Sequence, residues 1–211
     1  MQIAIIDYSI GNVQSITNAL SHNRDDIEII LTSERNEILQ SDAVILPGVG
    51  AFQRAMKELE KRNLPEILSE YIRLGKPLLG ICLGMQLLLE SSDEFGFAPG
   101  LGFLSGEVKK FPESVKDKLP NVAWNNLIAN SSKWENTILN EITPEDNFYF
   151  VHSYICIPSD PDTILATTDY GDIEFCSVMN NKNIYGCQFH PEKSSIKGLQ
   201  ILNNFIDIAE K

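Results

Sequence analysis

A cysteine at the junction between a strand and a helix is well suited to covalent chemistry. Cys82 stands in Gly80-Ile81-Cys82-Leu83-Gly84, after the apolar run PLL and before the run LGMQLLLESS. Glycines two residues on either side of a nucleophile let strand and helix approach without Cβ clashes, as in a nucleophile elbow. The helix start offers N–H groups and a positive dipole end, which lower the pKa of a thiol. The pattern predicts a catalytic Cys82; a buried structural cysteine is the alternative.

A thiolate nucleophile needs a base, and the base needs a group that orients it. His190 and Glu192 stand in QFHPE, and residues i and i+2 of an extended segment project to the same side. Pro191 fixes φ and stiffens the segment. The spacing predicts that Glu192 holds one ring nitrogen of His190 while the other faces the thiol; a strand end with a capped turn is the alternative. His22 is expected on the surface, at the polar end of a helix.

Strand and helix signals alternate over the first eighty residues, which must position these groups. Apolar runs predict buried strands at 2–7, 27–32, 42–48 and 76–82. Amphipathic stretches predict helices at 11–23, 51–62 and 64–75, and the helix after Cys82 is predicted over 83–92. Strands that are apolar throughout and alternate with helices indicate a parallel sheet covered on both faces.

The second half of the chain is rich in β-type runs joined by Asn, Asp, Gly and Pro. The runs are 106–111, 121–128, 147–157, 163–170, 173–180 and 183–190, with a hairpin through Asn181-Lys182-Asn183, and a final amphipathic helix is predicted over 194–211. The sequence contains no repeat and no Pro/Gly-rich linker. The prediction is a single α/β domain over 1–211, with a mixed central sheet flanked by helices and an antiparallel addition in its C-terminal half.

Composition narrows the possible functions. The 17 basic and 29 acidic residues give a net charge of −12, which disfavours a nucleic-acid partner. No apolar run reaches the roughly 18 residues that span a bilayer, and the N-terminus lacks the basic region of a signal peptide. Cys82, Cys156, Cys176 and Cys187 show neither a CxxC pair nor zinc-type spacing. This usage predicts reduced thiols in the cytoplasm, a core position for the last three cysteines, and neither metal nor cofactor.

The segments GICLGMQ and QFHPE, in this order, resemble the paired signature of class I glutamine amidotransferases. The resemblance extends through IAIIDY, LPGVGAF, FYFVHSY and QFHPEKSS to the glutaminase subunits of imidazole glycerol phosphate synthases. It implies a flavodoxin-like fold in which Cys82 attacks the side-chain amide of L-glutamine, His190 carries protons and Glu192 orients His190. It also implies a heterodimer with a (β/α)8-barrel cyclase of histidine biosynthesis, which receives the ammonia and forms imidazole glycerol phosphate and aminoimidazole carboxamide ribotide.

The same resemblance implies how the reacting amide is held. In Pro47-Gly48-Val49-Gly50 a peptide N–H is expected to turn toward the oxyanion, because glycines make that reorientation sterically cheap. The Leu83 N–H is the expected second donor. An ordinary turn after a buried strand is the alternative.

Further positions match groups that bind the substrate or the partner in the family. The implied substrate-binding residues are Gln86, Glu94, Ser153 and Tyr154, and the implied partner-facing residues are Trp124 and Asn125. The alternatives are a surface position for Gln86, a solvated helix end for Glu94 and a core position for Trp124. His152 is not taken as a base, because no carboxylate is placed beside it as Glu192 is beside His190.

Two departures from the family pattern concern the partner more than the chemistry. Ser9 stands where the family usually has Gly, and Val122-Ala123 precede Trp124 where Met-Gly is usual. They motivate an alternative: a paralogous subunit that supplies ammonia to a barrel partner in amino-sugar and surface-polysaccharide synthesis. A catalytically silent binding protein is a third hypothesis, against which the intact Cys82, His190 and Glu192 argue.

Overall fold

Parallel strands form one half of a mixed sheet in the computed structural model, which describes residues 1–22, 24, 26–129 and 134–211. Their order is β2 (Glu28–Thr32), β1 (Gln2–Ile6), β3 (Ala43–Leu46), β4 (Leu78–Ile81) and β14 (Ile184–Cys187). Every residue of β3, β4 and β14 is buried. Such strands are apolar along their whole length because both faces of the sheet are covered. The predicted α/β core is therefore confirmed.

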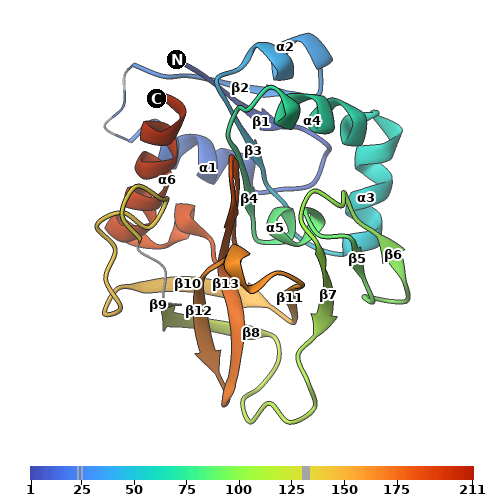
Figure 1. Ribbon diagram of the computed structural model, residues 1–211, viewed down its shortest axis with the longest axis vertical. Helices are drawn as coiled ribbons and strands as arrows, with labels where there is room; N and C mark the ends of the chain where they lie inside the picture. The colour runs from blue at the N-terminus through green and yellow to red at the C-terminus, as the bar shows by residue number, and fades with distance from the viewer. Residues whose placement is uncertain (23, 25, 130–133) are drawn as a thin grey trace.

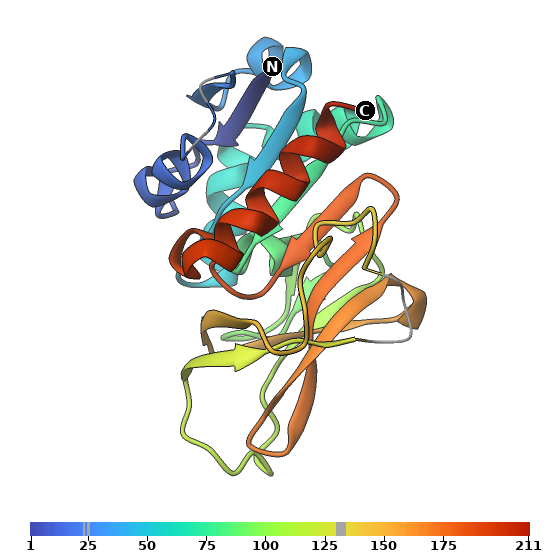
Figure 2. The same cartoon turned by 90° about the vertical axis from the view of Figure 1, so that its left-hand side faces the viewer.

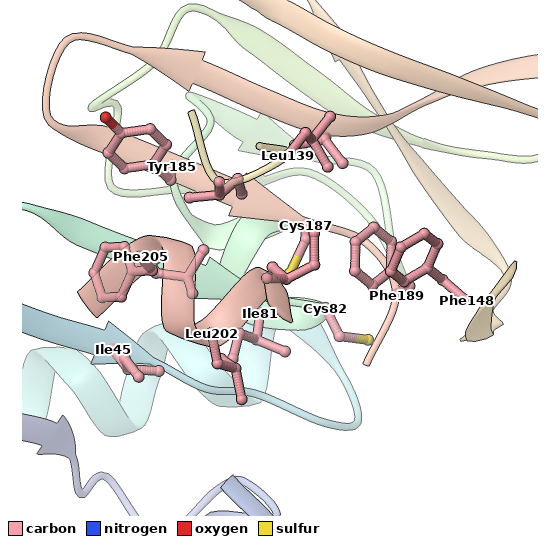
Figure 3. Packing of buried hydrophobic residues seen from close by; sticks show 14 of the residues in the cluster. Ile45, Ile81, Cys82, Leu139, Phe148, Tyr185, Cys187, Phe189, Leu202 and Phe205 are labelled. Atoms are coloured by element: carbon pink, nitrogen blue, oxygen red, sulfur yellow. The ribbon is translucent and has the colours of Figure 1, made fainter. Parts of the chain in front are cut away.

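Helices cover the two faces of these strands. They are α1 (Val13–Leu20), α2 (Arg35–Gln40), α3 (Phe52–Lys61), α4 (Leu64–Arg73), α5 (Leu83–Leu87) and α6 (Ser195–Ala209). Alternate residues of β1 point to opposite faces, so Ile3 joins the core cluster of α1 and α6 and Ala4 that of α3 and α4. Figure 2 shows α6 and α1 on the near face, and Figure 3 shows Leu202 and Phe205 of α6 in the cluster with Ile45 of β3. None of the helices in the described residues is long and apolar enough to cross a membrane.

The second half of the chain extends the sheet, mainly with antiparallel pairs. From β14 the order continues through β13 (Ile173–Asn181), β11 (Tyr154–Pro158), β7 (Gly106–Lys110), β5 (Ser91–Ser92) and β6 (Ala98–Pro99), and β12 (Ile164–Tyr170) joins β13 to β9 (Ile128–Ala129). A separate antiparallel ribbon consists of β8 (Asn121–Asn126) and β10 (Asn147–His152). Short 3-10 turns span Pro161–Thr163 and Pro191–Lys193. In Figure 1 these strands lie below the parallel ones, except for the end of β13 that pairs with β14. The predicted antiparallel addition and the hairpin into β14 are confirmed.

Two predicted elements around the site differ in extent from the structure. The helix predicted over 83–92 ends at Leu87, because Ser91–Ser92 instead pair with β6 and β7. The strand predicted over 147–157 is interrupted at Ser153, where the chain passes from the β8–β10 ribbon into the main sheet.

One helix was missed, and two helical predictions need correction. Helix α2 was not predicted, because Ile38 is its only buried residue and leaves no apolar stripe. The helix predicted over 11–23 is formed over Val13–Leu20, and Asn23 lies outside the described residues. The apolar spacing of the last helix places Ile196 on its buried stripe with Leu199, Leu202 and Ile206, but Ile196 is 77% exposed.

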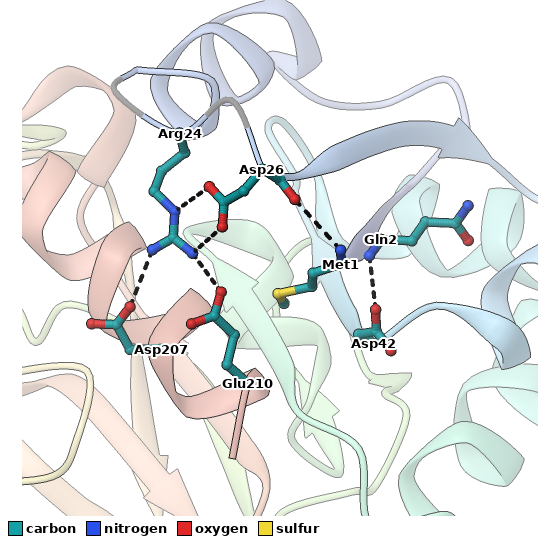
Figure 4. Close-up of polar contacts among 7 residues, drawn as sticks. All are labelled: Met1, Gln2, Arg24, Asp26, Asp42, Asp207 and Glu210. Carbon is teal, nitrogen blue, oxygen red and sulfur yellow. Dashed lines mark hydrogen bonds and ion pairs between the residues drawn. The ribbon is translucent and has the colours of Figure 1, made fainter.

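A cluster of ion pairs joins the C-terminal end of α6 to the segment before β2 (Figure 4). The Arg24 guanidinium lies 3.0 Å from a carboxylate oxygen of Asp26, 3.1 Å from Asp207 and 2.6 Å from Glu210. The three acceptors are exposed, so water screens each pair and each adds little to the stability of the fold. The cluster therefore mainly positions the C-terminal end of α6 against the segment before β2.

Candidate active site

Three neighbouring parallel strands end at the same edge of the sheet, and each is followed by a segment of the candidate site. Pro47 follows β3, Cys82 follows β4 and Gln188 follows β14. The backbone N–H of Cys82 donates to the Cys187 carbonyl oxygen at 2.8 Å, which ties the last two strand ends together. Sites of open α/β sheets lie at such carboxyl ends.

The backbone at Cys82 has the conformation expected of a nucleophile elbow. Its φ is +54° and its ψ is −111°, a region that residues with a Cβ rarely adopt. A Cβ at Gly80 would lie 2.7 Å from the Gly84 carbonyl oxygen, and one at Gly84 would lie 1.8 Å from the Leu46 carbonyl oxygen. Both glycines are therefore required for strand and helix to meet at the cysteine. Figure 3 shows Cys82 at the edge of the core cluster that contains Cys187.

The other three cysteines occupy core positions, as the sequence predicts. Cys156, Cys176 and Cys187 are buried free thiols. Burial raises the pKa of each of them, so they stay protonated at neutral pH.

His190 and Glu192 form a buried pair just beyond β14. The Nδ1 of His190 lies 2.9 Å from Glu192 Oε1, and both side chains are almost completely enclosed. Burial lowers the pKa of His190, but the adjacent Cys82 thiol and the Glu192 carboxylate raise it by more, to about 10. The imidazole is therefore a strong proton acceptor beside the thiol. Glu192 Oε2 is buried with no hydrogen-bond partner in the described part of the chain.

The Cys82 thiol has hydrogen-bond partners on two sides. Its S–H donates to the Val151 carbonyl oxygen of β10, with an S–O distance of 3.9 Å. The Gln188 Nε2 donates to the sulfur at 3.8 Å. The first contact favours the thiol and the second favours the thiolate, because a carbonyl repels a negative sulfur and an amide N–H stabilises it.

A cavity of about 550 Å³ lies in front of these groups, a size suited to a small polar molecule. Its lining includes Val49, Gly50, Cys82, Leu83, Gln86, Glu94, His152, Ser153, Tyr154, His190 and Lys193. The structure thus brings together most of the residues that the sequence assigns to catalysis and substrate binding. Glu192 lies behind His190 rather than on the cavity wall.

Two polar side chains on the cavity wall are already held by the protein. Gln86 is buried, and its Nε2 donates to the Tyr154 carbonyl oxygen at 3.2 Å and to Gln188 Oε1 at 3.0 Å. The surface alternative for Gln86 is therefore wrong. Glu94 Oε2 accepts the backbone N–H of Phe52 at 2.6 Å, at the first residue of α3. One carboxylate oxygen of Glu94 thus satisfies a free helix N–H, and the side chain is partly buried rather than a solvated helix end.

The segment after β3 combines a tight position with an open one. A Cβ at Gly48 would lie 2.7 Å from the Tyr8 hydroxyl oxygen, whereas a Cβ at Gly50 would meet nothing within 4 Å. Gly50 has φ +89°, and the Tyr8 hydroxyl donates to the Pro47 carbonyl oxygen. The peptide groups around Val49 therefore lie between Pro47 and Gly48, which are held by Tyr8, and Gly50, which has open space around it. The Leu83 N–H, the other predicted donor, lies at the first residue of α5, where no intrahelical acceptor exists.

His152 lies beside His190 but in a different environment. Burial lowers the pKa of His152 to about 4, although its bond to the Tyr154 carbonyl acts in the opposite direction. Its Nδ1 lies 2.9 Å from that carbonyl oxygen, and its Nε2 lies 3.1 Å from Asn121 Nδ2. The carbonyl can only accept and the amide nitrogen can only donate, so these contacts assign a neutral ring with its proton on Nδ1.

The residues predicted to face a partner are on the β8–β10 ribbon, outside the cavity lining. Trp124 is 51% exposed, so its core alternative is wrong. Asn125 is partly buried and follows it on β8, while Val122, two residues before, is exposed. His22 is exposed, as expected.

Two further polar residues close to Cys82 were missed by the sequence reasoning. Gln188 precedes His190 by two residues, so the alternation that linked His190 to Glu192 would also have placed it on this side. Tyr8 carried no comparable signal, since its contact with Pro47 joins residues 39 positions apart. The unusual Ser9 has φ +64°, which explains why glycine is favoured there, and its hydroxyl accepts from Arg62 at 2.9 Å.

Comparison with known proteins identifies the family. The family model described as glutamine amidotransferase class-I matches residues 4–209. Imidazole glycerol phosphate synthase subunit HisH of Listeria monocytogenes serotype 4a (strain HCC23) is 46% identical to this chain, covering 98% of it and 96% of the relative. The HisH subunit of Aquifex aeolicus (strain VF5) is 44% identical, covering 100% and 99%.

Solved structures agree with this family at the level of the fold. A structure described as a glutamine amidotransferase superposes with a TM-score of 0.72 at 17% identity, covering 99% of both chains. A structure described as PurLQS from Thermotoga maritima superposes with a TM-score of 0.71 at 17% identity, covering 98% of this chain and 97% of the other. From the family model and the identity to these relatives, the chain belongs to the class-I glutamine amidotransferases, in the family of the HisH subunits of imidazole glycerol phosphate synthase.

Proposed function

We propose that this glutaminase subunit hydrolyses L-glutamine to glutamate and ammonia through Cys82, His190 and Glu192. The observation that carries the proposal is the buried His190–Glu192 pair, which lies beside a cysteine in an elbow conformation and opens onto a cavity. The raised pKa of His190 means that the imidazole can take the thiol proton and hold it.

The reaction then proceeds in two steps. The Cys82 sulfur attacks the amide carbon of glutamine, His190 gives its proton to the leaving nitrogen, and ammonia departs from a γ-glutamyl thioester. Water attacks the thioester after His190 takes one of its protons, which returns to the sulfur as glutamate leaves. Glu192 holds the ring so that its Nε2 faces these atoms. N–H groups of Leu83 and of the Gly48–Gly50 segment would stabilise the negative oxygen of each tetrahedral intermediate.

The cavity wall offers complementary groups to a free amino acid. One oxygen of Glu94 caps α3, which leaves the other for the α-ammonium of the substrate. Both donors of Gln86 point to protein acceptors, so its Oε1 is the atom left to accept from the substrate. Backbone N–H groups of Ser153 and Tyr154, on the same wall, would meet the α-carboxylate.

The proposed partner is a (β/α)8-barrel cyclase in a cytoplasmic heterodimer, with ammonia passing from Cys82 to the barrel. The relatives are named as subunits of imidazole glycerol phosphate synthase, which supports such an assembly in histidine biosynthesis. The exposed side chains of Val49, Val122 and Trp124 provide apolar surface for it. The products would be imidazole glycerol phosphate and aminoimidazole carboxamide ribotide.

That residues 1–211 fold as one domain stays a prediction.

An amino-sugar pathway is the second candidate, because Val122 departs from the family pattern and lies exposed beside Trp124. Exchange of the cyclase tests it. Glutamate release that rises only with the histidine-pathway cyclase and its ribotide substrate would support the first candidate. Release that rises only with a sugar-amidating barrel would support the second.

The nucleophile assignment is tested with Cys82→Ala in the complex. We expect glutamate release to be abolished, partner binding to be kept and synthesis from added ammonium at alkaline pH to continue, because only the thiol has been removed. Glutamate release at the normal rate would refute the assignment. The isolated chain is expected to be nearly inactive, since the Gly48–Gly50 peptide must turn toward the oxyanion; a high rate without partner would contradict this gating.

A further inference from the structure

Gln188 lies at the centre of the site but has no part in the reaction described above. Its side chain is 0% exposed, so its carboxamide has exchanged all contact with water for contacts with protein. One of these contacts is with the Cys82 sulfur and the other is with Gln86. A buried amide costs free energy unless its groups are paired, and here the pairing connects the nucleophile to the cavity wall.

The backbone places this amide beside the sulfur. The Gln188 N–H donates to the Ser177 carbonyl oxygen at 2.9 Å, which continues the pairing of β13 beyond the end of β14. The Cys82 N–H donates at 2.8 Å to the carbonyl oxygen of Cys187, the residue before Gln188. Phe189 points into the core, so Gln188 and His190, on either side of it, point to the site.

The hydrogen-bond network determines which end of the amide faces the sulfur. Gln86 Nε2 must be a donor, because it contacts the Tyr154 carbonyl oxygen, which can only accept. The atom of Gln188 that it meets at 3.0 Å is therefore the oxygen. The nitrogen of Gln188 then points to Cys82, 3.8 Å from the sulfur. The contacts of Gln86 with Tyr154 and with Gln188 thus together assign an N–H donor to the thiol.

We propose that Gln188 is a positioning residue for the glutaminase reaction: its amide, oriented by Gln86, donates to the Cys82 sulfur and stabilises the thiolate. The inference rests on the proposed role of Cys82 as nucleophile. The Val151 carbonyl on the other side of the sulfur accepts the S–H and favours the protonated thiol. Gln188 opposes this contact and supplies a donor to the sulfur, both when the thiolate attacks the amide and when water expels the sulfur from the thioester.

The test is a titration of Cys82 in the isolated chain, by the pH dependence of its alkylation with iodoacetamide. Mass spectrometry of the Cys82 peptide separates it from the three other cysteines, all of them buried. Gln188→Met removes both contacts at similar size. Gln188→Glu keeps an oxygen for Gln86 but replaces the donor by a carboxylate. We expect the midpoint to rise by about one pH unit in the Met variant and by more in the Glu variant, where like charges meet.

Asn204→Leu is the matched control, because Asn204 is also a buried side-chain amide. Unlike Gln188, it donates to two backbone carbonyl oxygens away from the site. It lies on α6 and donates to the carbonyl oxygens of Ile138 at 3.0 Å and Asn140 at 2.7 Å. Its loss should destabilise the fold but leave the Cys82 midpoint unchanged. Wild-type midpoints in both Gln188 variants, with folding verified by near-UV circular dichroism, would overturn the proposal. Alkylation needs no turnover, so a failure of the proposed glutaminase would show separately, as absent glutamate release by the wild-type complex.

A measurement on the unsubstituted side chain covers the case in which the Gln188 variants do not fold. The NMR signals of the Gln188 side-chain amide should shift with pH at the same midpoint as Cys82 alkylation. That shift should vanish in Cys82→Ala. Amide signals that stay constant while Cys82 titrates would show that no N–H reaches the sulfur, and the proposal would be wrong.

Discussion

His190 and His152 line the same cavity, yet their surroundings move their pKa values in opposite directions. Burial lowers the pKa of both rings. For His190 the Cys82 thiol and the Glu192 carboxylate reverse this effect and raise the pKa to about 10. For His152 only the Tyr154 carbonyl opposes burial, and the pKa falls to about 4. The charge of the hydrogen-bond partner therefore decides which imidazole handles protons.

The two rings also differ in what their second nitrogen meets. His190 holds Glu192 with Nδ1 and turns its other nitrogen to the thiol. His152 uses both nitrogens on neutral groups, a backbone carbonyl and the Asn121 amide. Each His152 contact is satisfied without a net charge, so the ring serves as a fixed part of the wall. Adjacent histidines of one cavity can thus be divided between chemistry and structure by whether their nitrogens meet ionisable groups, as at Cys82 and Glu192, or neutral ones.

Glu192→Gln removes one of the two groups that raise the pKa of His190 and should have the largest effect. An amide at the same position cannot stabilise the imidazolium, so the pKa of His190 should fall and the ring should take protons from the thiol and from the attacking water less readily. We expect glutamate release by the complex to drop about 10²- to 10⁴-fold, the usual contribution of a general acid–base group. Steady-state glutamate release measures it, and NMR titration of the three histidine rings follows the pKa. Wild-type turnover in this variant would show that Glu192 does not orient His190.

The low pKa of His152 predicts a specific loss of stability in acid. Between about pH 6.5 and pH 4 the unfolded state binds a proton at this residue and the folded state does not, so stability falls as the pH falls. The full loss is about 3 kcal/mol, because each pKa unit corresponds to about 1.4 kcal/mol. Urea unfolding at several pH values, compared with His152→Gln, isolates the contribution from the carboxylates, which titrate in both proteins. Parallel curves for the two proteins would contradict the low pKa.

The surroundings of His190 could be predicted from the sequence, and those of His152 could not. Cys82 carried local glycine signals, and the two-residue spacing of His190 and Glu192 sufficed to place them together. The contact of His152 with Asn121 depends instead on the register of β8 against β10, which pairs two residues 31 positions apart. Periodicity predicts a strand but does not predict which of its residues faces which partner.

The fold shows the same division between local and non-local information. The strands β1, β3 and β4 were recognised because each consists of a continuous apolar run, preceded in β1 only by Gln2. The shortness of α5 could not be predicted, because LLLESS continues an apolar helical pattern and only the pairing of Ser91–Ser92 with distant strands ends it. Local propensity yields to tertiary pairing in such segments.

Asn121→Asp should bring the two histidines closer in behaviour by giving His152 a carboxylate of its own. The new group would face Nε2, where the amide now donates at 3.1 Å, and Asn125 could still donate to its other oxygen. An opposite charge at this distance raises a histidine pKa by about two units. NMR titration should therefore show the pKa of His152 rising from about 4 toward neutrality. A pKa that stays near 4 would mean that the Asp is itself protonated, and that burial outweighs charge at this wall.

The smallest expected effect concerns the aromatic residues that enclose His152. Its ring centroid lies 5.0 Å from that of Phe175 and 5.3 Å from that of Phe111, which together exclude water from the imidazole. Phe175→Leu opens part of this enclosure and should raise the pKa of His152 by about half a unit, since burial is the cause of the lowering.

Phe205→Leu is the matched control for this substitution, because Phe205 is equally buried but packs against Tyr185 on the α6 side. Both variants should lose stability, and only Phe175→Leu should change the NMR titration of His152. A shift in neither variant would assign the low pKa to the contact with Asn121, whose amide donates to the neutral ring, rather than to burial by the aromatic rings. The difference in pKa between His152 and His190 would then lie wholly in their hydrogen-bond partners, because removing part of the aromatic enclosure would have left the pKa of His152 unchanged.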